Sequence, residues 1–382
     1  MMDEEGRVID ETQDPKVGKE QTLRLYQTML RLSAMDTVLY DAQRQGRISF
    51  YMTNYGEEAT HVGTASAIKD DDVVYGQYRE VGVLLYRGFT IDEFVNQCTS
   101  NQYDYGKGRQ MPIHYGSDKL HFHTISSPLA TQIPQAAGNA YAMRLQAERE
   151  GTPKRVSVCY FGDGAASEGD FHAALNFAAV LGSPTIFVCR NNGYAISTPT
   201  KDQYRGDGIA ARGPAYGIHT IRVDGNDVWA VYNATKEARE IAVSKNAPVL
   251  IECMTYRVSH HSTSDDASRY RSTDELTHWT NDQSPIRRLR AYIVERGWWS
   301  EDEDKEFRDM ARKDVLKALP AAEKHRKPAV EHLFTDVYDE LTPELKRQRA
   351  ELIAHLEKYP DEYNLDAFEG GFEALKDAAA KR

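Results

Sequence analysis

Short apolar runs alternate with helical stretches through the middle of the chain. Four runs rich in β-branched and aromatic residues, at 155–161, 184–189, 218–223 and 248–253, are typical of buried strands. Amphipathic stretches at 169–182 and 227–244 separate the first two and the last two of these runs. Strands that alternate with helices predict parallel βαβ units with right-handed crossovers. We therefore expect an α/β fold in which a parallel sheet is flanked by helices on both faces.

Helical patterns precede and follow this alternating region. Helices are expected at 20–47, 56–69 and 128–149, with Pro128 in the first turn of the third. After Ser272 the chain becomes strongly charged, and further helices are expected at 283–296, 301–318 and 342–357. Residues 1–20 are polar and without a period, as in a tail or an arm. We expect this tail to be followed by one large α/β domain over 21–382, whose part from about 272 is helical.

Composition and charge narrow the class of protein. The net charge of -11 argues against a nucleic-acid partner, and no apolar stretch reaches the roughly 18 to 20 residues of a membrane span. The N-terminal residues are acidic, lack an apolar leader and are the opposite of an arginine-rich transit sequence, so we expect the cytosol, or the mitochondrial matrix if a transit peptide has been removed. Scattered cysteines in mostly apolar surroundings predict reduced core residues: Cys98, Cys159, Cys189 and Cys253.

Polar, small residues follow two successive expected strands. Gly162, Asp163 and Gly164 come after the first strand, and Asn192 comes after the second. Ligands of open parallel sheets bind beyond the carboxyl ends of the strands, and neighbouring strand ends lie about 5 Å apart. A carboxylate, an amide oxygen and the carbonyl of Tyr194 suit Mg²⁺, while small residues let backbone N–H groups approach a phosphate. The two motifs together indicate a diphosphate anchored through a divalent metal.

Each motif alone has a simpler interpretation. Gly-Asp-Gly after a strand is more often a turn, and Asn-Asn-Gly is mostly turn chemistry. A Rossmann dinucleotide site would need G-x-G-x-x-G and an acidic residue about 20 positions later, and that acidic residue is missing after Gly162. The pairing of both motifs at successive strand ends favours the metal and diphosphate.

The paired motifs resemble the thiamine diphosphate motif, which starts with Gly-Asp-Gly and closes with Asn-Asn. The resemblance continues through residues 78–80, 125–132, 205–214 and 256–266. These stretches are similar to α subunits of the E1 component of branched-chain 2-oxo acid dehydrogenases, and the likeness runs from about residue 40 to 360. The run His-His-Ser-Thr-Ser-Asp-Asp from His260 is its most specific piece. It separates this family from the similar pyruvate and acetoin dehydrogenase α subunits, which are kept as the alternative.

The resemblance implies a fold, a set of site residues and two cations. The fold is the thiamine diphosphate-binding fold, with helical N-terminal and C-terminal extensions. Mg²⁺ would be held by Asp163, Asn192 and the carbonyl of Tyr194. The cofactor would contact Tyr78, Arg79, Ser127, Gly162, Gly164, Ala165, Arg190 and His261. K⁺ would lie among Ser126, Pro128, Thr131 and Gln132, although a helix start capped by the Ser127 hydroxyl explains the same residues.

The histidine pair and two serines nearby complete the expected site. His261 and His260 are the expected catalytic residues, as donors to an anion or as proton carriers near neutral pH. Ser262 and Ser272 match positions that are phosphorylated in mitochondrial relatives, and capping of a helix explains Ser272 at least as well. The run 262–266 is small and polar, so we expect a mobile loop that the cofactor orders.

The resemblance also implies an activity and partners. The family catalyses oxidative decarboxylation of branched-chain 2-oxo acids and reductive acylation of the lipoyl group of an E2 component. Its cofactor is activated by a carboxylate on a second domain type, for which the flanking segments are too short and too helical. We therefore expect a β subunit to complete each active site in an α₂β₂ assembly, and the chain alone to be inactive. A non-catalytic scaffold is the alternative from another class, and the presence of the metal ligands and histidines counts against it.

Overall fold

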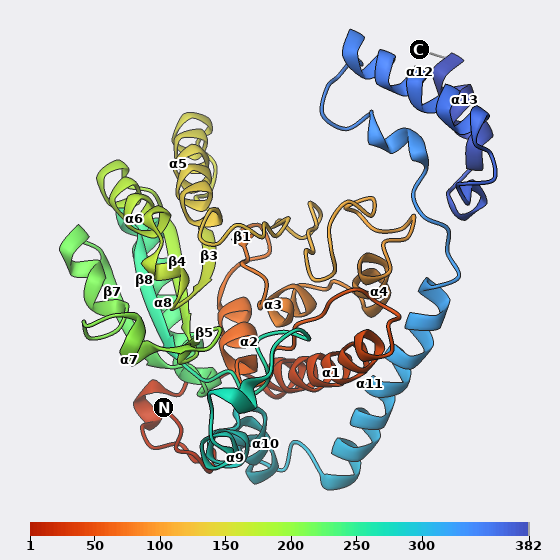
Figure 1. Cartoon of the computed structure of the whole chain (residues 1–382). Coiled ribbons are helices and arrows are strands. Elements are labelled where there is room, and N and C mark those ends of the chain that lie inside the picture. Colours follow the sequence, from red (N-terminus) through yellow and green to blue (C-terminus); the bar gives the residue numbers. More distant parts are fainter. Residues whose placement is uncertain (381–382) are drawn as a thin grey trace.

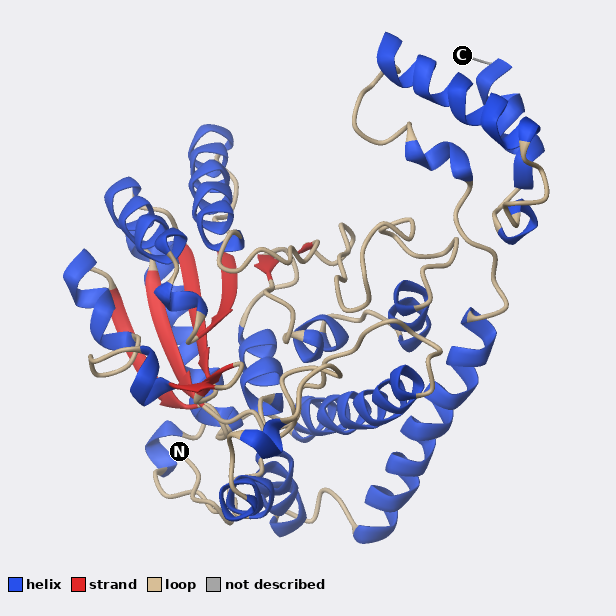
Figure 2. Cartoon of the chain, in the orientation of Figure 1, coloured by secondary structure: helices blue, strands red, loops and turns tan. Residues whose placement is uncertain are grey.

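The computed structural model describes residues 1–380 and is built around a parallel sheet (Figure 2). The strand order is β2-β1-β3-β4-β8-β7. The strands are β1 (Val73–Tyr75), β2 (Phe122–His123), β3 (Ser157–Gly162), β4 (Thr185–Asn191), β7 (His219–Asp224) and β8 (Val249–Met254). The four longer strands match the four expected runs to within two residues, and the α/β class is confirmed. β1 and β2 were missed because such short strands show no period in the sequence.

Helices cover both faces of the sheet (Figure 1). On one face, α5 (Gln132–Glu150) and α6 (Gly169–Leu181) pack over strand residues such as Phe161 and Phe187. On the other face, α8 (Val228–Lys245) packs over residues such as Val158, and α2 (Glu58–Ala67) packs against α8. Because alternate side chains of a strand point to opposite faces and helices cover both faces, both sets are buried and the central strands are mostly apolar.

Helices from both ends of the chain complete the body beside the sheet. α1 (Lys19–Arg44) and α11 (Glu301–Ala322) lie side by side, although they are far apart in the sequence (Figure 1). The other helices of the body are α3 (Val81–Tyr86), α4 (Ile91–Cys98), α7 (Thr200–Gln203), α9 (Thr273–Asn281) and α10 (Pro285–Glu295). The N-terminal arm lies on this body, where Met2 is buried and its backbone N–H donates to Asp227 at 2.6 Å.

The start of α5 differs from the expectation. The helix begins at Gln132, so Pro128 lies outside it. Ala130 takes a left-handed conformation at φ 67°, which an α-helix cannot include. The Ser127 hydroxyl does not cap the helix and instead contacts Nε2 of His114. The capping explanation for this loop is therefore wrong.

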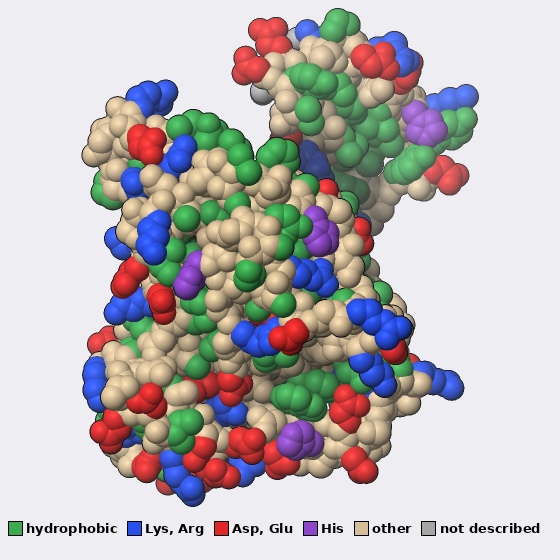
Figure 3. Space-filling view, turned by 90° about the vertical axis from the view of Figure 1, so that its left-hand side faces the viewer, with side chains coloured by type: hydrophobic (Ala, Val, Ile, Leu, Met, Phe, Trp, Pro, Cys, Tyr) green, Lys and Arg blue, Asp and Glu red, His purple; other side chains and the backbone are tan. Residues whose placement is uncertain are grey.

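Residues 330–380 form a small helical unit that stands away from the body (Figure 3). It contains α12 (Pro343–Lys358) and α13 (Gly371–Ala380). Its buried side chains form a separate cluster made of Phe334, Leu341, Leu356 and Leu375. Lys107 and Arg109 of the body both pair with Asp336 of the unit, and a largely apolar groove of about 640 Å³ lies between the two parts.

Two further expectations concern the whole chain. All four cysteines are buried and free, as expected. Over residues 1–380, no helix combines the length and the apolar character needed to cross a lipid bilayer.

Gly56 fixes how the chain enters α2 and gives a test of the fold. Its φ is +95°, and a Cβ there would lie 2.1 Å from the carbonyl oxygen of Tyr256. We expect Gly56→Ala to lower the free energy of unfolding by at least about 2 kcal/mol, because the left-handed region costs roughly 1–2 kcal/mol and the backbone contact adds to it. Urea unfolding followed by circular dichroism measures this change.

Gly46→Ala is the matched control. Gly46 also has a positive φ, 75°, but a Cβ there meets nothing within 4 Å. In this variant the free energy of unfolding should fall only by the cost of the left-handed conformation. Equal losses of stability in the two variants would contradict the close contact at Gly56.

Candidate active site

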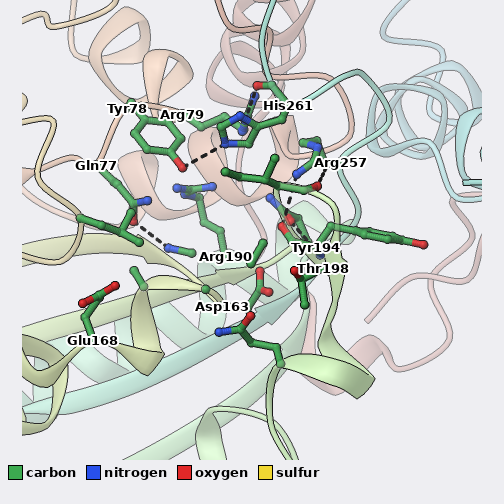
Figure 4. A pocket seen from close by; sticks show the side chains of 18 residues that line it. Gln77, Tyr78, Arg79, Asp163, Glu168, Arg190, Tyr194, Thr198, Arg257 and His261 are labelled. Carbon is green, nitrogen blue, oxygen red and sulfur yellow. Dashed lines mark hydrogen bonds between the residues drawn. The ribbon is translucent and has the colours of Figure 1, made fainter. Parts of the chain in front are cut away.

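A cavity of about 290 Å³ opens at the carboxyl ends of β3 and β4 (Figure 4). The two strands are parallel neighbours, and Gly162 of β3 pairs with Arg190 of β4. The turns that follow them therefore meet at one edge of the sheet, as the sequence predicted. The opposite wall comes from residues 77–79, from the hairpin of β5 (Tyr194–Ala195) and β6 (Thr198–Pro199), and from Arg257 and His261.

Asp163 presents a buried carboxylate oxygen to the cavity. The residue is 1% exposed, and within residues 1–380 its Oδ2 has no hydrogen-bond partner. Burial raises the pKa of Asp163 to about 6, the charge of Glu57 adds to this shift, and the N–H of Asn192 opposes it. A buried oxygen without a partner is costly unless a cation or a donor satisfies it.

Asn192 and Tyr194 lie beside this carboxylate. Nδ2 of Asn192 donates to Glu57 at 2.7 Å, and its Oδ1 accepts from the N–H of Tyr194 at 3.3 Å. The carbonyl of Tyr194 accepts from Arg257 at 3.3 Å, and its hydroxyl donates to Glu275 at 3.0 Å. The hairpin is thus fixed against the turn after β4.

A buried ion-pair cluster forms the floor of the cavity. Arg190 donates from Nη1 to Glu57 at 2.7 Å and from Nε to Glu80 at 2.5 Å. All three side chains are essentially inaccessible to solvent, and Nη2 of Arg190 has no partner in the described part of the chain. Arg79 lies 3.7 Å from Glu57 and donates to the carbonyls of Thr53 and His261. Arg190 therefore keeps one nitrogen available to an anion in the cavity.

The two histidines have different surroundings. His261 lines the cavity, with its Nε2 3.5 Å from the hydroxyl of Tyr78. Burial, together with Arg79 and Arg257, lowers the pKa of His261 to about 3, so the imidazole is neutral near pH 7. His260 is absent from the cavity lining, and its Nδ1 accepts from the N–H of Ala267 at 2.9 Å.

Comparison with known proteins gives the family. The family model described as Dehydrogenase E1 component matches residues 26–331. The chain belongs to this family. The resemblance found in the sequence is confirmed, and members of the family use thiamine diphosphate as their cofactor.

Relatives of high identity share one name. The 2-oxoisovalerate dehydrogenase subunit alpha, mitochondrial, of Dictyostelium discoideum is 58% identical over 99% of this chain and 85% of its own length. The protein of the same name from Homo sapiens is 58% identical over 97% of this chain and 82% of its own length. The Arabidopsis thaliana subunit alpha 1 is 52% identical over 95% of this chain and 76% of its own length.

Most of the predicted cofactor residues meet in the cavity. Those that line it are Tyr78, Arg79, Gly162, Gly164, Ala165, Arg190 and His261, together with the predicted magnesium ligands Asp163, Asn192 and Tyr194. Ser127 lies outside this lining. Three of the predicted potassium residues lie in the loop before α5, where the Thr131 hydroxyl donates to the Pro128 carbonyl at 3.0 Å. The fourth, Gln132, begins α5, and its Oε1 is buried and has no partner within residues 1–380.

The two serines are held by local hydrogen bonds. Ser262 is only 8% exposed, and its hydroxyl accepts from the N–H of Ser264 at 3.2 Å. Thr263, in the loop that is expected to be ordered by the cofactor, exchanges two hydrogen bonds with Tyr51, of 3.1 and 3.2 Å. Ser272 caps α9 by accepting from the N–H of Glu275, which confirms the capping explanation.

Sequence reasoning missed several residues of the site. The Oε1 of Gln77 accepts from the N–H of Gly162 at 2.9 Å. Gln77 lies beside, and Arg257 inside, a stretch that carries the family resemblance, so their position was a usable signal. Glu57 gave no signal, because a glutamate at a helix start is ordinarily exposed to solvent. The remaining lining residues are Leu129, Glu168, Ala195, Ile196, Thr198 and Gln203.

The lowered pKa of His261 predicts a pH dependence of stability. The folded pKa of about 3 lies below the ordinary 6.5, so the unfolded chain binds an extra proton between these values. Stability should therefore fall as the pH drops below about 6.5, and His261→Gln should remove this part of the slope. Urea unfolding between pH 5 and pH 8 measures both slopes. The same slope in both proteins would show that the imidazole is not buried in its neutral form.

Proposed function

We propose that the chain is the α subunit of a thiamine diphosphate-dependent E1 that decarboxylates branched-chain 2-oxo acids and acylates the lipoyl group of an E2 component. The observation that carries the proposal is one cavity in which Asp163 and Arg190 both offer a buried, unpartnered polar atom of the described chain. The names of the relatives favour a branched-chain substrate over the pyruvate or acetoin alternative.

The residues of the cavity fit a magnesium diphosphate. Asp163, Oδ1 of Asn192 and the carbonyl of Tyr194 would hold Mg²⁺; this carbonyl has two lone pairs, so the bond from Arg257 leaves one for the metal. Nη2 of Arg190 would face the diphosphate. A Cβ on Gly164 would lie 2.7 Å from the Cβ of Ala195, so only glycine leaves the turn after β3 this close to the hairpin.

The remaining proposed contacts orient the cofactor. When bound, thiamine diphosphate supplies the carbanion that decarboxylates the 2-oxo acid. His261 and the Tyr78 hydroxyl would donate hydrogen bonds to the diphosphate, which would raise the pKa of the imidazole by its negative charge. Arg79 would act through the His261 carbonyl that it holds. Ser127 could join only by turning away from His114, and His260 is not proposed as catalytic because its ring lies outside the cavity.

A second cation on the loop of residues 126–132 is also part of the proposal. The carbonyl of Pro128, the hydroxyl of Thr131 and the buried Oε1 of Gln132 are neutral oxygen ligands that suit K⁺, and Ser126 lies on the same loop. In the described chain no group of three or more His, Cys, Asp or Glu side chains surrounds a metal position. Asp163 would be the one carboxylate ligand of Mg²⁺, and the other proposed protein ligands of both cations are amide, hydroxyl and carbonyl oxygens.

The proposed partners are a β subunit, in an α₂β₂ assembly, and a lipoyl-bearing E2. The described chain has one parallel sheet and one two-stranded hairpin, which supports a second chain as the source of the activating carboxylate. The relatives are named as mitochondrial subunits, which supports the mitochondrial matrix over the cytosol as the compartment.

Phosphorylation of Ser262 is the proposed regulation. The added phosphate would carry roughly two negative charges. It would place them at a buried hydroxyl that lies close to Asp265 and to the diphosphate. The loop would have to leave its contacts with Tyr51 to accommodate it. At Ser272 a phosphate would act on the cap of α9.

The need for a partner can be tested by activity. The purified chain with thiamine diphosphate and Mg²⁺ should release no CO₂ from 3-methyl-2-oxobutanoate above background. With the β subunit, and with a lipoylated E2 domain present in both assays as the acceptor, it should turn over 3-methyl-2-oxobutanoate, and faster than pyruvate at equal concentration. Robust turnover by the chain alone would refute the shared active site, and a preference for pyruvate would favour the alternative substrate.

The metal site can be tested by calorimetry of thiamine diphosphate binding with Mg²⁺ to the αβ complex. Asn192→Ala should weaken binding by roughly 100-fold or more, because loss of even an outer-shell partner typically costs 10–100-fold. Asn191→Ala is the matched control, since the Asn191 side chain bonds Tyr204, Glu252 and the N–H of Gly193, and in the described chain no hydrogen bond joins it to a proposed metal ligand. Equal affinities for Asn192→Ala and the unmodified complex would contradict the assigned ligand.

A further inference from the structure

Glu57 contacts both sides of the proposed cofactor site from outside the sheet. It lies just before α2 and is 0% exposed. Its Oε2 accepts from Nη1 of Arg190 at 2.7 Å, and its Oε1 accepts from Nδ2 of Asn192 at 2.7 Å. One carboxylate therefore joins the arginine of the proposed diphosphate contact to a proposed metal ligand.

The contact with Asn192 selects one orientation of an ambiguous side chain. The oxygen and nitrogen of a carboxamide are nearly equal in shape, and only the oxygen can bind a cation. An ionised carboxylate accepts hydrogen bonds and cannot donate them. Glu57 therefore attracts the –NH₂ group of Asn192, which leaves Oδ1 on the other side, where the N–H of Tyr194 also reaches it at 3.3 Å.

Charge keeps Glu57 in the accepting form. Glu57 lies between the guanidinium groups of Arg190 and Arg79, and two positive charges this close favour its ionised form. Nε of Arg79 lies 3.7 Å from Oε1. Glu57 and Glu80 together balance the charges of Arg190 and Arg79 in a region closed to solvent.

We propose that Glu57 is a positioning residue for the metal site, which turns the Asn192 amide oxygen toward Mg²⁺ and holds Arg190 with Nη2 toward the diphosphate. The inference rests on the proposed function and assigns Glu57 no contact with substrate or cofactor. It predicts that metal binding depends more on a hydrogen-bond acceptor facing the Asn192 amide than on the negative charge of Glu57.

Glu80 provides a comparison within the same cluster. It is equally buried and accepts from Arg190 at 2.5 Å, but its other bonds are to the N–H groups of Gln77 and Tyr78. No hydrogen bond joins it to Asn192 among the described residues. Glu80→Gln thus removes one buried charge beside Arg190 and leaves the amide orientation untouched.

The experiment measures the affinity of the αβ complex for Mn²⁺, used in place of Mg²⁺, with saturating thiamine diphosphate. Electron paramagnetic resonance detects the Mn²⁺ that stays free. Glu57→Gln should weaken Mn²⁺ binding by roughly 10- to 100-fold, because a glutamine can donate to Oδ1 of Asn192 and so reverse the amide. Glu80→Gln should weaken it by less than about tenfold. Similar losses in the two variants would overturn the proposal, since charge alone would then explain them.

A second substitution tests orientation directly. In Glu57→Gln with Asn192→Asp, the carboxylate at 192 has two equivalent oxygens, so one can bind the metal while the other accepts from the glutamine, and the total charge is restored. This double variant should recover Mn²⁺ binding to within about tenfold of the unmodified complex. Failure to recover, with a thermal midpoint like that of the unmodified complex, would contradict the orienting role.

Two controls separate the possible failures. Should Glu57→Gln alone fail to fold, Mn²⁺ affinity is compared between Asn192→Asp and the double variant, and a large loss in the double variant would overturn the inference. Should the unmodified αβ complex bind neither Mn²⁺ nor thiamine diphosphate, the proposed function fails. Normal binding by the unmodified complex and by Glu57→Gln would overturn only the role of Glu57.

Discussion

The parallel pairing of β3 with β4 is the constraint on which the site depends. Six pairs of residues hold the two strands in register, from Ser157 with Thr185 to Gly162 with Arg190. Because every side chain of β4 is buried, a slip of one residue would turn its apolar residues away from one core layer and into the other. The hydrophobic layers on the two faces therefore fix the distance between the turns after the strands, and with it the distance between Asp163 and Asn192.

The floor of the site adds a second constraint of a different kind. Arg79, Arg190, Glu57 and Glu80 are closed to solvent, and burying such charges is unfavourable unless each finds its partner. Glu57, Arg79 and Glu80 come from outside the strand pair, just before α2 and just before α3, so their ion pairs with Arg190 tie these segments to the end of β4. These ion pairs hold fixed the groups that the proposed cofactor would contact. One polar atom of Asp163 and one of Arg190 have no protein partner in the described chain.

The sequence predicted the parts of this site that follow from periodicity and from motifs. The four long strands and the turns at Asp163 and Asn192 were predictable because apolar runs end abruptly there. Side-chain direction in loops was not predictable: His260 and His261 are adjacent, yet only His261 faces the cavity, because the N–H of Ala267 holds the ring of His260. The loop before α5 was misjudged because Pro128 is typical of a first helical turn, whereas the left-handed Ala130 delays the helix. Glu57 and Glu80 depend on partners distant in sequence, which no local pattern reveals.

The separate C-terminal unit has a consequence for how the chain meets other molecules. Residues 330–380 have their own small core, and the ion pairs of Lys107 and Arg109 with Asp336 that join them to the body are partly exposed. Partly exposed pairs of this kind contribute only about 0–1 kcal/mol. Large side chains such as Leu333, Val337 and Tyr338 are more than half exposed on or beside the unit. The backbone bonds of Lys327 with Ala367 and Glu369 add to these pairs, and an assembled neighbour that covers the exposed side chains would fix further the angle at which this appendage projects.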